Sequence, residues 1–369
     1  MTPFVSVLGD RESQTNERTN HDARYTNDND PRITNHKSRI VMFFILLIVL
    51  GLVLLSEFVN GWNDATNAIA TVISTRVLSP AQAITMAVCF NIVGTMSGTA
   101  VATTIGKGMV TPDVITLPTI GAALVAVVLW GAPASYLGLP ISITHALLGG
   151  LAGAGFATAG VGALQWAGWR KVGLGLLFST FLGFGGGLVI MVSIYRLFAK
   201  VRPAVVRRVF GKAQILSAAF MAFSHGSNDG QKFIGIFSLA LLLGGVHQTF
   251  HVPVWVVLLC AGTMGLGTSI GGWSIIKTMG MKITKLEPVH GFAAETAAAT
   301  TIELASRMGI PLSTTHTITT AIMGVGATRR FSAVRWGVSR DIVTAWLLTF
   351  PACGLISWLA TKLVLHLAP

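Results

Sequence analysis

The sequence predicts an all-α integral membrane protein built from two repeats. Of its 369 residues, 52% are hydrophobic and only 11% are charged, whereas a soluble domain carries about 25% charged residues. Several apolar runs reach the roughly 20 residues that a helix needs to cross a bilayer. Short motifs also occur twice along the chain in the same order. Together these observations exclude an ordinary soluble enzyme.

The charged residues are unevenly distributed along the chain. Residues 1–39 hold six basic and six acidic side chains, so the net charge of +12 comes entirely from the residues that follow. This polar stretch is predicted to be a disordered tail rather than a signal peptide. The later basic residues form short clusters between apolar runs, which favours membrane loops over a nucleic-acid-binding surface.

Six apolar runs are the clearest predicted spans. They cover residues 40–59, 83–105, 117–137, 172–198, 252–276 and 342–365. Between them lie apolar stretches interrupted by glycine, proline and polar residues, at 60–76, 139–158, 217–245, 289–307 and 311–327. Polar backbone at membrane depth is tolerated only where it faces protein or a water-filled cavity. The interrupted stretches are therefore expected to line a substrate path.

A basic segment divides the chain into two halves. Residues 200–212, KVRPAVVRRVFGK, hold five basic residues and no acid, a composition typical of a cytoplasmic loop. The predicted organisation is a tail over residues 1–39, a first membrane repeat over 40–199, a basic cytoplasmic linker over 200–212 and a second membrane repeat over 213–369. The number of spans stays open, because re-entrant segments do not change sides of the membrane.

Two motifs recur in both halves. The first half reads N-G-W-N-D-A-T-N-A-I from Asn60 and the second reads S-H-G-S-N-D-G-Q-K-F-I from Ser224, so both contain G-x-N-D. Further on, G-L-P-I-S-I-T-H ends at His145 and G-I-P-L-S-T-T-H ends at His316, which lie 81 and 87 residues after the motif aspartates. Duplicated halves with interrupted segments at matching positions are typical of a transporter whose site lies between the repeats.

The paired asparagines and aspartates are candidate coupling-ion ligands. They are Asn63, Asp64, Asn228 and Asp229, and they lie in apolar segments where a charge costs on the order of 3 kcal/mol. Their oxygens are hard ligands of the kind that small cations prefer, and a buried aspartate can also bind and release a proton. The alternative interpretation is that each pair caps a helix N-terminus.

The two P-x-S-x-T-H motifs are candidate anion sites. Their hydroxyl side chains are Ser142, Thr144, Ser313, Thr314 and Thr315. A proline just before them favours the start of a helix, where free backbone amides and the helix dipole attract an anion. Several converging donors suit a tetrahedral oxyanion. Alternatively, these hydroxyls hydrogen-bond neighbouring carbonyls, as is common in membrane helices.

Four more ionisable residues lie in or near these motifs. His145 and His316 have no second ligand at i+3 or i+4, so a hydrogen bond within the hairpin is favoured over zinc and no metal is expected. Lys232 could offset the charge of the anion, pair with Asp229 or reach the membrane surface. Glu295 lies in an Ala/Thr-rich segment and is interpreted as a gating or coupling carboxylate rather than a structural one.

These motifs resemble those of the inorganic phosphate transporter family, known as PiT. The paired G-x-N-D signatures, the G-Q-K extension at residues 230–232, both P-x-S-x-T-H elements and G-F-x-x-E at 291–295 carry the resemblance, which covers about residues 40 to 365. The chain departs from the family pattern in three places. Trp62 stands where many members have alanine, Ile143 replaces a hydroxyl residue, and Asn91 stands where some members have glutamate.

The resemblance implies a secondary transporter of inorganic phosphate that works by alternating access and symport with Na⁺ or H⁺. It implies two inverted repeats whose broken helices and re-entrant hairpins meet at the repeat interface. No catalytic residue is expected, and no cofactor apart from the coupling ion. The expected partners are phosphate, either free or as a metal complex, and the lipid bilayer, with no nucleic acid. The implied location is the inner (plasma) membrane, and a homo-oligomer is compatible with it.

Three other functions compete with this interpretation. A sulfate permease of the same fold is the runner-up, because sulfate is also a tetrahedral anion. A membrane-embedded hydrolase would need a nucleophile, a base and a metal, yet the sequence contains no H-E-x-x-H motif and no Walker motif. A channel is disfavoured because duplicated interrupted segments are typical of a carrier.

Overall fold

The structure is a computed structural model that describes residues 31–367. The chain divides into two units, residues 1–44 and residues 45–369, and all contacts discussed below lie within the second unit. Most of the predicted tail over residues 1–39 falls outside the described residues. Its last part, from Pro31, is the beginning of the first helix.

Every regular element among the described residues is helical. The α-helices are α1 (Pro31–Ser74), α2 (Pro80–Thr95), α3 (Ala100–Gly108), α4 (Leu117–Leu137), α5 (Ile143–Ala159), α6 (Trp166–Leu197), α7 (Pro203–His225), α8 (Gln231–Leu243), α9 (Val254–Ile270), α10 (Trp273–Lys277), α11 (Pro288–Arg307), α12 (Thr314–Ala327) and α13 (Trp336–Leu367). Short 3₁₀ turns lie at Pro112–Val114, Gly160–Ala163 and Phe331–Ala333, and π-helical turns at Gly226–Gly230 and Thr278–Lys282. The predicted all-α fold is confirmed.

Within residues 31–367, five helical segments are long and apolar enough to cross a membrane. They are residues 39–74, 117–137, 143–163, 166–197 and 336–367. Two bent pairs, α2 with α3 at 65° and α9 with residues 273–282 at 63°, would raise the number to seven if each pair is one span. The predicted spans over 83–105 and 252–276 fall on these bent pairs. The other four predicted spans fall largely within α1, α4, α6 and α13.

Helix α1 corrects one prediction. An interrupted segment is expected over residues 60–76, but α1 continues without a break to Ser74. The glycine in this stretch serves helix packing, because a Cβ atom on Gly61 would lie 2.3 Å from the backbone oxygen of Met264 in α9. Gly61 therefore allows close contact between two helices, the usual role of small residues in membrane bundles.

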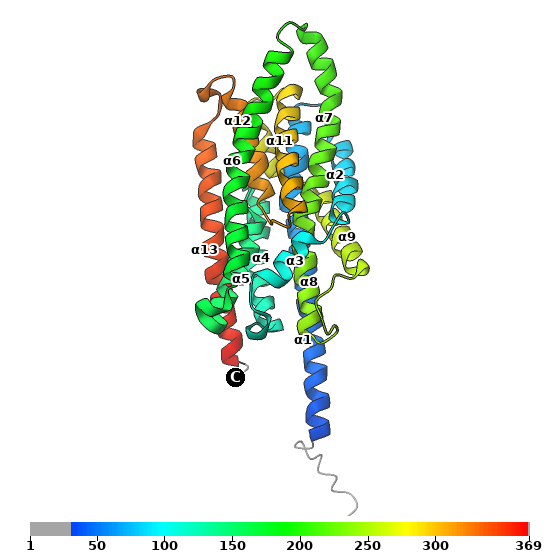
Figure 1. The fold of residues 1–369 in the computed structure, drawn as a ribbon, viewed down its shortest axis with the longest axis vertical. Coiled ribbons are helices and arrows are strands. Elements are labelled where there is room, and N and C mark those ends of the chain that lie inside the picture. The colour runs from blue at the N-terminus through cyan, green and yellow to red at the C-terminus, as the bar shows by residue number, and fades with distance from the viewer. Residues whose placement is uncertain (1–30, 368–369) are drawn as a thin grey trace, which may run out of the picture. The chain divides into compact units, whose positions relative to one another are not determined.

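Two helical hairpins lie end to end. The α4–α5 pair occupies the lower half of Figure 1 and the α11–α12 pair the upper half. In each hairpin a left-handed glycine follows the first helix, Gly138 with φ +75° and Gly309 with φ +63°, a conformation that favours glycine. The two tips touch, because the Thr144 hydroxyl donates to the carbonyl of Leu312 at 3.0 Å.

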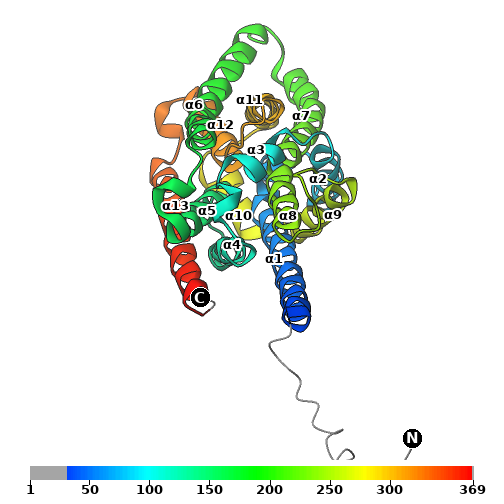
Figure 2. The same ribbon diagram turned by 60° about the horizontal axis from the view of Figure 1, so that its bottom comes forward.

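The long helices α6 and α7 enclose the second hairpin. Figure 2 shows α11 lying between α6 and α7. The predicted basic linker, residues 200–212, begins in the connection between α6 and α7 and continues into α7. Most of this segment is helix rather than loop, since α7 begins at Pro203. The division into repeats over residues 40–199 and 213–369 stays a prediction.

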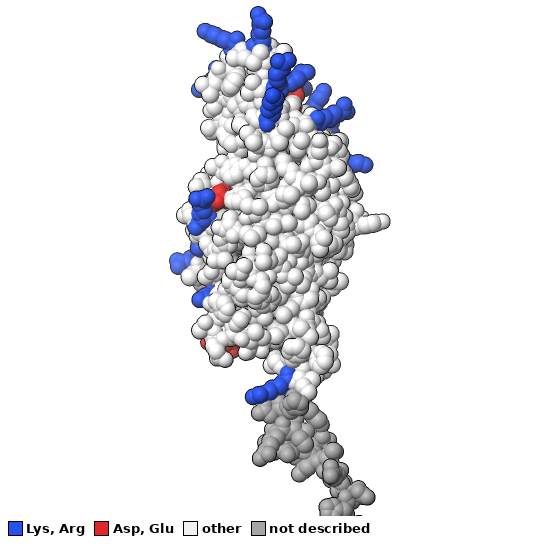
Figure 3. All heavy atoms as spheres, turned by 90° about the vertical axis from the view of Figure 1, so that its right-hand side faces the viewer, with Lys and Arg blue, Asp and Glu red and all other residues white. Residues whose placement is uncertain are grey.

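Basic side chains gather at one end of the second unit. Figure 3 shows Lys and Arg concentrated at the top, where Figure 1 places the α6–α7 connection, above a broad face that is mostly uncharged. A basic end beside an apolar belt is what the positive-inside rule associates with the cytoplasmic surface.

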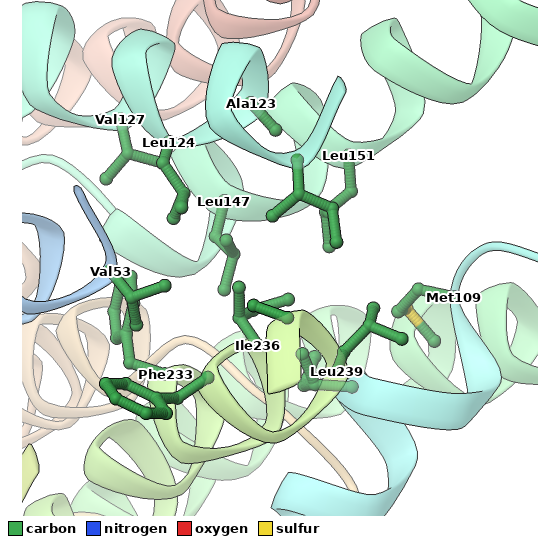
Figure 4. Packing of buried hydrophobic residues seen from close by; sticks show 14 of the residues in the cluster. Val53, Met109, Ala123, Leu124, Val127, Leu147, Leu151, Phe233, Ile236 and Leu239 are labelled. Atoms are coloured by element: carbon green, nitrogen blue, oxygen red, sulfur yellow. The ribbon is translucent and has the colours of Figure 1, made fainter. Parts of the chain in front are cut away.

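An apolar core holds the first hairpin against helices from both halves of the chain. Figure 4 shows Val53 of α1, Leu124 of α4, Leu147 of α5 and Phe233 and Ile236 of α8 gathered around one interior region. All five are at most 1% exposed. Interiors of this kind are densely packed, so α1, which contains the first G-x-N-D motif, and α8, which follows the second, pack tightly against the first hairpin.

Candidate functional site

The helices at the two hairpin tips, α5 and α12, begin where the P-x-S-x-T-H motifs predict helix starts. Ser142 is the N-cap of α5 and accepts a hydrogen bond from the backbone N–H of His145 at 3.2 Å. Ser313 is the N-cap of α12 and accepts one from the N–H of His316, also at 3.2 Å. Each P-x-S-x-T-H motif therefore begins a helix whose first amides point toward the meeting place of the tips.

The two asparagine–aspartate pairs lie inside helices. Asn63 and Asp64 lie within the last third of α1, and Asn228 and Asp229 lie in the π-helical turn between α7 and α8. The N-cap interpretation is therefore wrong for both pairs. All four side chains are buried. A π-helical turn within a longer helix is frequent at functional sites.

One hairpin tip contacts both aspartates. The Thr315 hydroxyl donates to Asp64 Oδ1 at 3.1 Å, and the neighbouring Thr314 hydroxyl donates to Asp229 Oδ2 at 2.9 Å. The structure thus brings candidate anion ligands and candidate cation ligands from distant parts of the sequence into one hydrogen-bonded group.

The asparagines make matching contacts in the two halves. Asn63 Nδ2 donates to Ser135 Oγ at 2.9 Å, and Asn228 Nδ2 donates to Ser306 Oγ at 2.9 Å. Each of these serines precedes the capping serine of its hairpin by seven residues. The repeat therefore extends to side-chain contacts, and the shared spacing is the signal by which Ser135 and Ser306 could have been found.

The amide oxygens of the same asparagines differ between the halves. Asn228 Oδ1 accepts a hydrogen bond from the backbone N–H of Leu312 at 3.2 Å. Asn63 Oδ1 is buried and has no hydrogen-bond partner among the described residues. Because an unpaired buried oxygen is costly, this atom in the first half is available for a ligand.

His225 is a site residue that the sequence analysis missed. Its Nε2 lies 4.0 Å from Asp64 Oδ2 and 3.6 Å from Asp229 Oδ2. Its Nδ1 lies 3.0 Å from Asn91 Oδ1, an oxygen that can only accept, so Nδ1 carries the hydrogen and Nε2 faces the carboxylates. One ligand atom each from Asp64, His225 and Asp229 lie within 4.8 Å of one another, close enough to hold a cation together. The signal was a histidine four residues before Asp229.

Lys232 points into the site. Its Nζ contacts Asp229 Oδ1 at 2.5 Å, Thr144 Oγ1 at 2.5 Å and the carbonyl oxygen of Leu312 at 2.7 Å. The residue is only 2% exposed. The interpretation of Lys232 as a side chain that reaches the membrane surface is therefore wrong.

Asn67 occupies the corresponding place in the first half. It follows Asp64 by three residues, as Lys232 follows Asp229. Its Nδ2 donates to Thr315 Oγ1 at 3.1 Å and lies 3.3 Å from Thr314 Oγ1. Alignment of the two motifs was the signal that could have identified Asn67.

Glu295 lies outside this group but is connected to it through α1. Its carboxylate accepts hydrogen bonds from Thr71 Oγ1 at 2.5 Å, from Gln214 Nε2 at 3.0 Å and from Ser217 Oγ. Thr71 follows Asp64 by seven residues, which is about two helical turns on the same face of α1. The buried carboxylate therefore connects α11 to α1 and α7.

The motif histidines pack against each other instead of holding the hairpins by side-chain hydrogen bonds. The rings of His145 and His316 are 4.6 Å apart edge to face, and His316 stacks on Trp346 at 3.8 Å. His145 Nδ1 and His316 Nε2 have no hydrogen-bond partner among the described residues. The two rings therefore connect the hairpins through aromatic contact.

Comparison with known proteins identifies relatives of this chain. A model described as the phosphate transporter family matches residues 60–357. A protein named "Probable low-affinity inorganic phosphate transporter" from Rhizobium meliloti (strain 1021) is 44% identical, covering 85% of this chain and 95% of its own. The protein of the same name from Bacillus subtilis (strain 168) is 39% identical, covering 87% and 97%.

A solved structure is also similar to this chain over most of its length. The structure titled "The sodium-dependent phosphate transporter" has 27% sequence identity and a TM-score of 0.79, and the similarity covers 88% of this chain and 100% of that one. The family match spans both G-x-N-D motifs and both hairpins. The chain belongs to the phosphate transporter family.

Proposed function

We propose that this phosphate transporter works by symport of phosphate with Na⁺ or H⁺ and by alternating access. The family and the relatives are transporters rather than enzymes, and the apolar helices make the chain an integral multi-pass membrane protein. The solved relative is titled sodium-dependent, which supports cation coupling. None of the relatives described above is named for sulfate, so the sulfate alternative has no support.

The proposed phosphate ligands are the hydroxyls at the hairpin tips, together with the first backbone amides of α5 and α12. These hydroxyls belong to Ser142, Thr144, Ser313, Thr314 and Thr315. Helix N-termini that converge with hydroxyl donors suit an anion. The proposed ligands of the coupling ion are Asn63, Asp64, Asn228 and Asp229, whose oxygens suit a small cation.

One observation carries the proposed coupling. Thr314 and Thr315 donate their hydroxyl hydrogens to Asp229 and Asp64, and a hydroxyl has only one hydrogen to donate. When phosphate accepts that hydrogen, the aspartate loses a donor, and a cation or proton at the aspartate replaces it. Binding of the anion then favours binding of the cation, as symport requires.

Glu295 is proposed to act in gating. Glu295 lies on α11 and its three hydrogen-bond donors come from α1 and α7, so a movement of α1 that accompanies binding at Asp64 would break or remake bonds to this carboxylate. Lys232 is proposed to act in coupling, through its contact with Asp229.

The test is phosphate uptake by the purified protein in sealed proteoliposomes, with Na⁺ and pH gradients imposed separately. Uptake above the equilibrium level with at least one gradient is expected, together with little competition by sulfate. Omission of divalent metal, with EDTA present, distinguishes free phosphate from a metal-phosphate complex as the substrate. Absence of uptake with both gradients, with and without divalent metal, would contradict the proposal.

A further inference from the structure

The ammonium group of Lys232 has the surroundings of a bound metal cation. Its Nζ lies 2.5 Å from a carboxylate oxygen of Asp229, 2.5 Å from the hydroxyl oxygen of Thr144 and 2.7 Å from the carbonyl oxygen of Leu312. Carboxylate, hydroxyl and carbonyl oxygens are the ligand types that bind hard cations in proteins. Lys232 is also one of the largest fully buried side chains in the described part of the chain.

The hydrogen atoms of Lys232 are all used by the protein. An ammonium group has three hydrogens to donate, and three protein oxygens lie within 2.7 Å of Nζ. No donor is left over for a phosphate oxygen. Lys232 therefore serves the protein as a counter-charge for Asp229 and does not act as a phosphate ligand in this arrangement.

The first half of the chain has no such built-in cation. The position that corresponds to Lys232 is Asn67, a neutral residue whose side-chain amide contacts Thr314 and Thr315. The basic side chain beside Asp64 is His225, but it is shared with the second half, because its Nε2 lies 4.0 Å from Asp64 Oδ2 and 3.6 Å from Asp229 Oδ2. In addition, the amide oxygens of Asn63 and Asn67 are buried and lack hydrogen-bond partners in the described structure.

The two otherwise similar motifs thus differ in their charge balance. In the second half, Lys232 and Asp229 neutralise each other at 2.5 Å. In the first half, the carboxylate of Asp64 has a hydroxyl donor in Thr315 and two unpaired amide oxygens nearby in sequence, but no lysine or arginine partner among residues 31–367. A cation arriving from solution is therefore needed at Asp64 and is redundant at Asp229.

We infer that Lys232 is a tethered cation that permanently fills the second of two corresponding cation sites, so that the exchangeable coupling ion binds at Asp64. Each transport cycle then moves one cation fewer per phosphate than it would with a neutral residue at position 232. This inference rests on the proposed symport and specifies which of its two ion sites exchanges.

The test replaces Lys232 by the residue that the first half uses. Wild type, Lys232→Asn and a control variant, Lys212→Asn, are reconstituted, and the number of charges moved per phosphate is obtained from the membrane potential that stops net uptake. Lys212 is exposed on α7 and undergoes the same chemical change. Lys232→Asn is expected to need one additional cation per phosphate and a steeper dependence on cation concentration. Lys212→Asn is expected to match wild type.

Two results with a folded Lys232→Asn protein would count against the inference. An unchanged cation number in Lys232→Asn would overturn it. So would a folded Lys232→Asn protein that transports no phosphate at any cation concentration, because a vacated site should accept a cation from solution. If the single variant does not fold, the double variant Asp229→Asn/Lys232→Met removes both charges and is expected to keep the wild-type cation number. A changed number, or a double variant that also cannot fold, would overturn the inference.

The proposed symport and this inference fail in different ways. Wild-type vesicles that take up no phosphate under either gradient contradict the symport itself. Wild-type uptake combined with an unchanged cation number in Lys232→Asn contradicts only the role of Lys232.

Discussion

The Thr315 hydroxyl donates a hydrogen bond to Asp64 at 3.1 Å across 251 residues of sequence. The donor is at the start of α12 and the acceptor is in the last third of α1, so this bond joins a candidate anion-binding helix terminus to a candidate cation ligand. Its neighbour Thr314 makes the corresponding bond to Asp229 at 2.9 Å. Because each hydroxyl has one hydrogen, anion and aspartate compete for it, and this competition is the physical basis of the coupling proposed above.

Thr315→Val should weaken phosphate binding while keeping the shape of the side chain. The expected loss is about 1 to 3 kcal/mol, or roughly 5- to 150-fold in affinity, because a charge-assisted hydrogen bond is removed. The measurement is equilibrium binding of labelled phosphate at fixed cation concentration. Thr317→Val is the control, since the Thr317 hydroxyl bonds the carbonyl of Ser313 within the same helix. Equal affinities in the two variants would contradict the assignment.

Asp229→Asn should destabilise the protein more than Asp64→Asn does. Loss of the Asp229 charge leaves the buried ammonium of Lys232 unpaired, and breaking a buried ion pair costs about 3 to 5 kcal/mol. Asp64 has a hydroxyl partner but no lysine or arginine partner in the described part of the chain, so its neutral replacement removes no such pair. Thermal unfolding of the two variants in the same detergent measures the difference. Equal melting temperatures would show that Lys232 does not depend on Asp229.

Glu295→Gln should lower stability and impair uptake. The carboxylate accepts three hydrogen bonds. In glutamine an NH₂ group replaces one of the two oxygens, so a hydrogen-bond donor would face the donors that now bind the carboxylate. A mismatched buried polar group costs about 1 to 3 kcal/mol. Glu287→Gln, at the N-cap of the same helix, is the control because Glu287 pairs with Arg329 and both side chains are exposed, and exposed pairs contribute about 0 to 1 kcal/mol. Similar unfolding temperatures and uptake rates in both variants would refute this role.

Gly61→Ala should disturb the contact between α1 and α9. The added methyl group would lie 2.3 Å from the backbone oxygen of Met264, so one helix must move, at a cost of about 1 to 3 kcal/mol. Gly51→Ala in the same helix is the control, because nothing lies within 4 Å of its Cβ position. The yield of monodisperse protein and its melting temperature report the effect. A Gly61→Ala protein as stable as Gly51→Ala would mean that the contact is unimportant.

Sequence periodicity and composition predicted the helical class and several boundaries well. The predicted span over residues 117–137 coincides with α4, and Ser142 and Ser313 cap α5 and α12 where the P-x-S-x-T-H motifs indicate helix starts. These features depend on local chemistry, namely hydrophobic length and the preference of serine for N-caps. The continuity of α1 through Gly61 was missed, because tertiary packing overrides the low helix propensity of glycine.

Within the site, the motif residues were found but their partners were not. No local sequence pattern predicts that Asp64 contacts Thr315 or that Lys232 contacts Thr144, because both contacts join opposite halves of the chain. The burial of Lys232 was equally hidden, because a lysine after an apolar segment usually reaches the surface. The role of Asn67, by contrast, could have been predicted by aligning the two motifs.

A cation at Asp64 is proposed to drive phosphate accumulation through the hairpin tips. The most direct test compares wild type and Asp64→Asn in proteoliposomes under the gradient that drives wild-type uptake, with binding of labelled phosphate showing that the variant is folded. Wild type should accumulate phosphate above its equilibrium level, and Asp64→Asn should bind phosphate but not accumulate it. Accumulation by Asp64→Asn with the wild-type dependence on the gradient would contradict the claim.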